Sequence, residues 1–135
     1  MEKKKPVCPE GIVVKRSSAG LGLFATRAFK NGERVIEYFG RTLSKAEEYT
    51  SKSKYLFEVH SRKTIDGTTR ENVARYINHS CKPNCEPNIV RSRVWIDAIK
   101  GIKAGEELSY DYGEEYFDEH IKPHGCRCVR HASKK

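Results

Sequence analysis

Two short segments concentrate the residue types that could do chemistry. The first, from Asn78 to Cys85, holds a histidine, two cysteines, two asparagines, a serine and a proline within eight positions. A structural turn with a hydrogen-bonded histidine would also account for this composition. A Cys-His nucleophile pair is disfavoured, because neighbours in sequence rarely form such a pair in space. The second segment contains Tyr110 and Tyr112, which are spaced to project from one face of a strand and could equally belong to the core.

A pair of glycines, Gly20 and Gly22, follows a predicted strand. Glycine lets the backbone come close to a ligand, although a lone G-x-G is more often an ordinary turn. No third glycine and no β-α-β unit follow. The sequence therefore disfavours a dinucleotide-binding site of the Rossmann type.

The five cysteines favour a metal over disulfides. Four of them form the spacings Cys81-x3-Cys85 and Cys126-x-Cys128, and no secretion signal precedes them. Reduced thiols at such spacings are typical of metal ligands in an intracellular protein. Residues 121–135 lack apolar periodicity, so we expect a metal or a ligand to order them.

The length of 135 residues suits one domain. The net charge of +8 favours nucleic acid as a partner, or a protein that lies near nucleic acid. Seven acidic residues nevertheless lie between Ala104 and Ile121 without a lysine or arginine. They form either a solvated loop or a groove for a basic peptide. No apolar run is long enough to cross a bilayer, so we expect an intracellular protein without membrane contact.

The elements that must position these residues are mainly β-strands. Short runs of valine, isoleucine, tyrosine and phenylalanine between turn signals predict strands at residues 12–15, 23–26, 34–39, 55–59, 87–90 and 93–98. Ser44 and Glu47 form a capping box that predicts a helix starting there, and residues 70–75 predict a single helical turn.

Taken together, the motifs resemble those of the SET-domain protein lysine methyltransferases over roughly residues 12–118. The segments that carry the resemblance, in the order and spacing of that family, are Gly20–Ala25, Tyr55–Phe57, Ile65–Thr68, Ala74–Asn84 and Gly105–Gly113. The resemblance implies a fold of several small β-sheets with a pseudoknot-like crossing and few short helices. It divides the chain into a basic leader at 1–11, a SET domain at 12–118 and a cysteine-containing tail at 119–135. Two features differ: no cysteine-rich segment precedes the domain, and Glu71-Asn72 replaces a frequent Gly-Asn.

The resemblance also implies S-adenosylmethionine as methyl donor and a set of site residues. Tyr112 would orient the methyl and the amine, Tyr55 would line the lysine channel, and Tyr110 would limit the number of methyl groups added, mainly to one. The residues implied to hold the cofactor are Gly20, Leu21, Gly22 and Leu23 through their backbone, Asn78 through its side chain, His79 through its backbone, and Tyr112.

A zinc site is implied by the family's C-x-C-x4-C tail motif, whose cysteines join that of the Asn-His-Ser-Cys block. Cys81, Cys126 and Cys128 match, but Ser133 stands at the last position. His131 is the favoured fourth ligand, since imidazole is an ordinary zinc ligand. Cys85 is the competitor, and a site without metal is the remaining alternative.

These observations predict a protein lysine N-methyltransferase acting on a histone tail or another basic peptide. The alternatives are methylation of a non-histone basic protein, and a zinc-stabilised binding module without turnover. Weak nucleic-acid contact through the basic ends is expected. The predicted location is the nucleus or chromatin if the protein is eukaryotic or directed at a host, and otherwise the cytoplasm.

Overall fold

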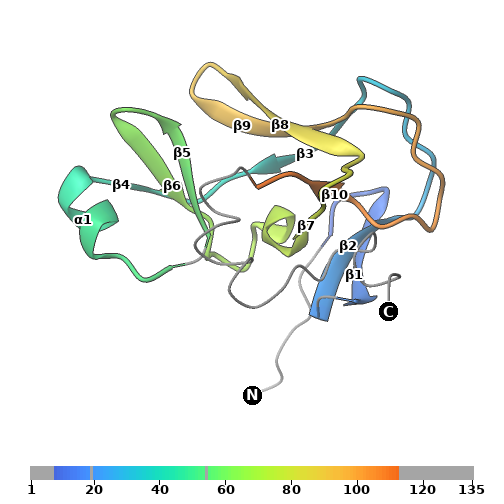
Figure 1. Ribbon diagram of the computed structural model, residues 1–135, viewed down its shortest axis with the longest axis horizontal. Helices are drawn as coiled ribbons and strands as arrows, with labels where there is room; N and C mark the ends of the chain where they lie inside the picture. The colour runs from blue at the N-terminus through green and yellow to red at the C-terminus, as the bar shows by residue number, and fades with distance from the viewer. Residues whose placement is uncertain (1–7, 19, 54, 113–135) are drawn as a thin grey trace.

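Short β-strands make up most of the ordered architecture. The structure, a computed structural model, describes residues 8–18, 20–53 and 55–112. Figure 1 shows four small sheets arranged around the centre of the molecule, with one short α-helix at its edge. The mainly β prediction is confirmed.

One hairpin and one three-stranded sheet form the N-terminal part and the middle. Strands β1 (Ile12–Ser17) and β2 (Gly20–Ala25) pair antiparallel over their whole length. Strand β3 (Arg34–Tyr38) pairs with β9 (Arg93–Ala98), and β9 pairs in turn with β8 (Cys85–Val90). The predicted strands at 12–15, 23–26, 34–39, 87–90 and 93–98 are therefore present, within a few residues at their ends.

The second three-stranded sheet carries the helix. It consists of β4 (Arg41–Leu43), β6 (Lys63–Asp66) and β5 (Leu56–His60), in the order β4-β6-β5. Helix α1 (Lys45–Thr50) begins with the predicted capping box, in which Ser44 and Glu47 bond reciprocally. The helix has no buried residue, so capping rather than packing defines it.

The Asn78 and Tyr110 segments lie side by side. Strand β7 (Asn78–His79) pairs in parallel with β10 (Ser109–Tyr110), through the partners Ser109–Asn78 and Tyr110–His79. The 3₁₀ helix η1 (Val73–Tyr76) leads into β7 and corresponds to the predicted single turn. Backbone hydrogen bonds between β7 and β10 thus join the Ala74–Asn84 segment to the segment that contains Tyr110.

The core lies between these sheets and is made mostly of aliphatic side chains. The fully buried apolar residues include Leu23, Val73, Ile77, Val94, Ile96, Ile102 and Leu108. They come from four different parts of the chain, so the core fixes β2, η1, β9 and the segment before β10 against one another. Within the described residues, no helix is long and apolar enough to cross a membrane.

Candidate functional site

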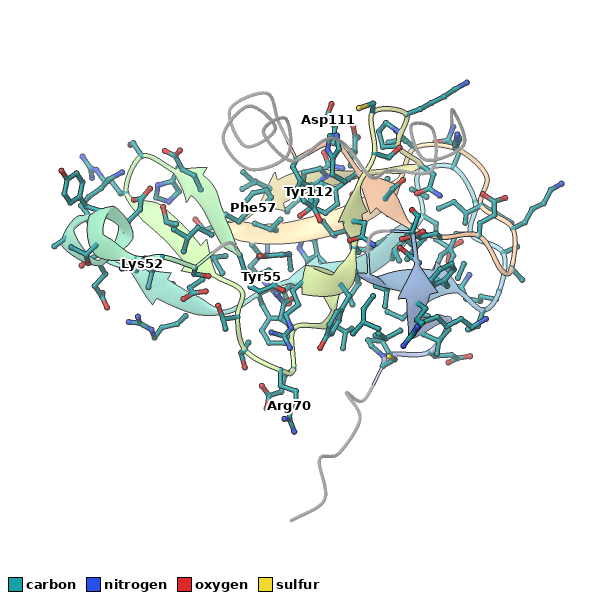
Figure 2. The ribbon with its side chains drawn as sticks, turned by 60° about the horizontal axis from the view of Figure 1, so that its bottom comes forward. Lys52, Tyr55, Phe57, Arg70, Asp111 and Tyr112 are labelled. Atoms are coloured by element: carbon teal, nitrogen blue, oxygen red, sulfur yellow. The ribbon has the colours of Figure 1, made fainter. Side chains whose placement is uncertain are left out.

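A pocket of about 380 Å³ opens where the sheets meet. It is lined by side chains from β2, β3, the start of β5, η1, β7 and the segment around β10: Leu21, Tyr38, Tyr55, Leu56, Phe57, Arg75, Tyr76, Asn78, Tyr110 and Tyr112. Figure 2 shows Tyr55, Phe57 and Tyr112 in the middle of the molecule, whereas Lys52 and Arg70 lie towards its edge. A volume in this range is sufficient for a small-molecule ligand.

The lining is largely aromatic and contains no carboxylate or imidazole among the described residues. Among the described residues that line it, none is aspartate, glutamate or histidine. Five are tyrosines, and one, Arg75, is charged at neutral pH. Such a pocket can orient and desolvate a ligand, but it offers no carboxylate or imidazole as a general base.

The Tyr112 hydroxyl has a defined hydrogen-bond direction. It donates to the backbone carbonyl of Ile77. With its proton engaged there, the oxygen can present its lone pairs to a donor in the pocket. Tyr112 also packs its ring 4.9 Å, centroid to centroid, from the ring of Tyr110, which is buried.

His79 contacts Tyr112 through a hydrogen bond and through its ring. Its side chain is buried and accepts a hydrogen bond at Nδ1 from the backbone N–H of Tyr112, with an N···N distance of 3.2 Å. The two rings also meet edge to face, with centroids 5.4 Å apart. His79 does not line the pocket, and its backbone is paired with Tyr110 in the β7–β10 ladder. Whether that backbone also contacts a cofactor stays a prediction.

Asn78 lies in the pocket wall and is fixed by three neighbours. Its Nδ2 lies 2.9 Å from the backbone carbonyl of Leu21 and 2.9 Å from Glu107 Oε2. A third contact, at 3.1 Å, is with the hydroxyl of Ser17. Protein groups thus hold the amide nitrogen. The carboxamide oxygen of Asn78 is therefore the group that a ligand could contact.

Gly22 is needed for this arrangement. A Cβ at that position would lie 2.4 Å from Glu107 Oε2 and 3.1 Å from Asn78 Nδ2. The sequence suggested that a glycine here lets a ligand approach the backbone. The structure gives a different physical reason, because the space beside Gly22 is occupied by the Glu107 carboxylate and the Asn78 amide.

The other residues of the predicted glycine turn are placed differently. Leu21 lines the pocket and is half exposed. Gly20 is exposed, with a φ of +102°, and Leu23 has its side chain in the core, with its carbonyl accepting from Leu108 N–H. Neither Gly20 nor Leu23 is among the pocket-lining residues, so their role as cofactor contacts stays a prediction.

Sequence reasoning did not single out half of the pocket wall. Tyr38, Leu56, Phe57, Arg75 and Tyr76 line it without having been named as site residues. Four of them belong to the segments Tyr55–Phe57 and Ala74–Asn84, whose spacing carried the family resemblance. That spacing was the signal that could have found them, whereas Tyr38 sits in an ordinary strand pattern.

The predicted acidic groove is only partly described. Glu106 Oε1 accepts from the backbone N–H of Lys103, and Glu107 braces Asn78. These two carboxylates therefore accept hydrogen bonds from groups of the protein itself, while Asp111 is exposed. The remaining acids of the segment lie outside the described residues.

The predicted zinc ligands are described only in part. Cys126, Cys128 and His131 lie outside the described residues, and within the described ranges no group of three or more suitable side chains could hold a metal. Cys81 is partly exposed, with Sγ 3.4 Å from His79 Nε2. Cys85 is buried, and burial raises the pKa of its thiol to about 12. Since Cys85 packs in the hydrophobic core with 1% of its surface exposed, it is a poor competitor for the site.

Comparison with known protein families gives one match that covers this site. The family model described as "SET domain" matches residues 20–113, which include every pocket-lining residue.

Similar curated proteins are much longer than this chain. The histone-lysine N-methyltransferase trithorax of Drosophila virilis is 38% identical over 121 residues, covering 81% of this chain and 3% of that protein. A histone-lysine N-methyltransferase of Saccharomyces cerevisiae described as H3 lysine-4 specific is 34% identical over 142 residues, covering 94% of this chain and 13% of that protein.

Solved structures with the same fold include those of Polycomb Repressive Complex 2 from Chaetomium thermophilum. A humanized mutant bound to an inhibitor matches with a TM-score of 0.70 and 36% identity, over 78% of this chain and 15% of that chain. An autoinhibited form bound to S-adenosylmethionine matches with a TM-score of 0.70 and 35% identity, over the same shares of the two chains.

Proposed function

This chain belongs to the SET-domain family, and we propose that it transfers a methyl group from S-adenosylmethionine to the side-chain amine of a protein lysine. The observation that carries the proposal is the pocket itself, which joins the predicted cofactor residues Leu21 and Asn78 to Tyr55, Tyr110 and Tyr112. One of the similar structures is bound to S-adenosylmethionine, which supports the choice of donor.

The pocket residues fit such a reaction. S-adenosylmethionine, when bound, supplies an electrophilic methyl on a positively charged sulfonium sulfur. The lysine nitrogen forms the new N–C bond as the S–C bond breaks, so the amine must arrive neutral and in line. Tyr112 suits the orienting role, because its proton is engaged with Ile77 O and its oxygen can accept a hydrogen bond from the amine.

No dedicated base is required. A lysine has an ordinary pKa of about 10.4, and burial among aromatic rings favours its neutral form. A positive charge at about 4 Å, with an effective dielectric of about 20, contributes a further ~4 kcal/mol or roughly three pKa units. This agrees with a lining in which no described residue is a carboxylate or imidazole.

We propose a histone tail as the substrate and chromatin as its location. The similar proteins of Drosophila virilis and Saccharomyces cerevisiae are both named histone-lysine N-methyltransferases, and the basic character of a histone tail suits an acidic segment near the pocket. A zinc ion held by Cys81, Cys126, Cys128 and His131 would order the tail beside the pocket. Monomethyl-lysine is the proposed main product.

The test is transfer of labelled methyl from S-adenosylmethionine to a mixture of the four recombinant core histones. We expect incorporation into lysine with the unmodified protein. In a parallel reaction with ribosomal proteins, labelling there but not of the histones would change the substrate class and keep the reaction. Binding of S-adenosylmethionine without transfer to any protein would favour the binding-module alternative.

Tyr112→Phe provides the matched control for this assay. It keeps the ring and removes the hydroxyl that bonds to Ile77 O. Because a misplaced reacting group costs about 100-fold in rate, we expect turnover to fall by roughly that factor while cofactor affinity is kept. A wild-type rate in this variant would refute the role of Tyr112.

A further inference from the structure

Tyr55 belongs to the predicted reaction site and stands just outside a strand. It lies one residue before β5 and is only partly buried. A residue in such a place needs other contacts to keep its ring in one position. Since Tyr55 is proposed to line the lysine channel, the groups that hold it bear on how the substrate is presented.

The Tyr55 backbone is fixed from two sides. Its carbonyl accepts from the Tyr38 hydroxyl at 2.7 Å and from the Gly67 backbone N–H at 2.9 Å. Its own N–H donates to the Ser53 hydroxyl at 3.1 Å. Gly67 must be glycine here, because a Cβ would lie 2.5 Å from the Tyr38 hydroxyl. These bonds fix the backbone of Tyr55 and do not involve its ring.

Arg75 covers the ring. Its guanidinium carbon lies 5.5 Å from the centroid of the Tyr55 ring and 4.8 Å from that of Tyr76, distances at which a guanidinium is attracted to an aromatic face. All three side chains line the same pocket. A planar guanidinium between two rings restricts both of them.

Arg75 is itself anchored at both terminal nitrogens. One, Nη1, donates to the backbone carbonyl of Thr68, and the other, Nη2, donates to the Tyr76 hydroxyl, each at 2.8 Å. Its Nε is buried and makes no hydrogen bond to any residue in the described parts of the chain. Stacking on Tyr55 and these two bonds therefore determine where the guanidinium sits.

We propose that Arg75 is a positioning residue that clamps the Tyr55 ring and thereby sets the shape of the lysine channel. The proposal rests on the proposed methyltransferase function for its kinetic consequence, but the clamp itself is independent of turnover. It predicts that loss of Arg75 acts on the rate with the protein substrate, through Tyr55, and spares cofactor binding.

The first experiment measures the clamp without turnover. In protein labelled with ¹³C-tyrosine, the Tyr55 ring signal is assigned by its loss in Tyr55→Phe. We expect Arg75→Ala to move this signal and Arg70→Ala to leave it in place, since Arg70 is an exposed arginine that points away from the pocket in Figure 2. An unmoved Tyr55 signal in Arg75→Ala would overturn the clamp.

The second experiment is a double-mutant cycle on the four recombinant core histones. We expect Arg75→Ala to lower kcat by at least about tenfold at saturating S-adenosylmethionine, because small misplacements of a reacting group cost up to about 100-fold. In a Tyr55→Ala background the same change should cost less than about twofold, since coupled residues are not additive. Full additivity, or an equal loss of S-adenosylmethionine affinity by calorimetry, would overturn the proposal.

Two milder variants cover the case in which Arg75→Ala does not fold. Arg75→Lys keeps the charge and loses the planar stack, and Tyr76→Phe removes only the hydroxyl that anchors Nη2. Both should lower kcat in the same direction, and wild-type kcat in both would refute the clamp. An unmodified protein that methylates nothing, with a Tyr55 signal that still responds to Arg75, would refute the proposed function alone.

Discussion

At the scale of single residues, the site depends on hydroxyls and amides held in fixed directions. Tyr112 has its proton committed to Ile77 O, and Asn78 has its Nδ2 committed to Leu21 O and Glu107. Both groups are therefore held in defined orientations at the pocket wall. Chemistry of this kind relies on placement more than on shifted acidity, which agrees with the absence of carboxylates and imidazoles from the described lining.

Tyr110 leads to a prediction about product. It is buried, and its ring packs against Tyr112, so its hydroxyl occupies space beside the reacting centre. Removing one oxygen gives a growing methylammonium more room. We expect Tyr110→Phe to stay active and to shift the product from monomethyl-lysine towards dimethyl- and trimethyl-lysine, as measured by mass spectrometry of reacted histones. Abundant trimethyl-lysine from the unmodified protein would show that Tyr110 does not limit methylation.

Gly22→Ala tests the brace between Asn78 and Glu107. The new Cβ would sit 2.4 Å from Glu107 Oε2 and would push the carboxylate away from Asn78. Because Asn78 would lose one of the three contacts that hold its amide, we expect S-adenosylmethionine affinity to fall by ~1–3 kcal/mol, measured by calorimetry. Gly101→Ala is the control, because a Cβ there meets no atom within 4 Å. Equal affinities in the two variants would remove the brace from the binding site.

At the scale of elements, the β3-β9-β8 sheet is joined by one buried carboxylate. Asp97 on β9 accepts from Arg34 Nε on β3 at 3.0 Å and from Asn88 Nδ2 on β8 at 2.9 Å. Burial acts to raise the pKa of Asp97, but the hydrogen bonds from Arg34 and Asn88 outweigh it and leave the pKa below its usual value.

This lowered pKa predicts a pH-dependent contribution to stability. A carboxyl whose folded pKa lies below its unfolded value of about 3.9 contributes fully above that pH, and the contribution is lost as the pH falls through the folded pKa. We expect Asp97→Asn to lower the free energy of unfolding by about 1–2 kcal/mol at pH 7, with the difference from wild type shrinking below about pH 4. Urea titrations at several pH values measure this, and a difference that is constant with pH would contradict it.

Elements with a local signal were predictable, and those made by distant pairing were not. The strands around Ile36 and Ile96 follow from runs of β-forming residues, and α1 follows from its Ser44 capping box. Strands β7 and β10 have two residues each and exist because they pair with one another, with partners 31 positions apart (Asn78 with Ser109, His79 with Tyr110). Helix α1 ends after six residues, because it buries no side chain that would extend it.

The site was predictable to the extent that motif spacing reflects it. Tyr55, Asn78, Tyr110 and Tyr112 were named from the sequence and all line one pocket. Arg75 was not named, because its role depends on Tyr55, which only the fold brings beside it. Gly22 was named for close approach of a ligand to its backbone, which stays a prediction. That Glu107 also crowds this position could not be read from the sequence, because Glu107 comes from the other end of the domain.

At the scale of the whole molecule, the pocket lies at the junction of all four sheets. Leu21 comes from the β1–β2 hairpin, Tyr38 from the β3-β9-β8 sheet, Phe57 from the β4-β6-β5 sheet, and Tyr110 from the β7–β10 pair. No single sheet contains a complete wall. Activity therefore requires the relative placement of the sheets that the shared core provides, and we infer that destabilising the core lowers turnover as well as stability.

The proposed zinc site would connect the domain, at Cys81, to the C-terminal tail. The site is predicted to hold about one Zn²⁺ per chain, measured by elemental analysis of protein purified without chelators. Cys81→Ser, Cys128→Ser and His131→Ala should each reduce the metal content, because a tetrahedral site needs all four ligands. Cys85→Ser should retain the metal, since Cys85 packs in the hydrophobic core with 1% of its surface exposed. Retention of zinc in Cys81→Ser with loss in Cys85→Ser would reverse the assignment, and protein without zinc would refute the site altogether.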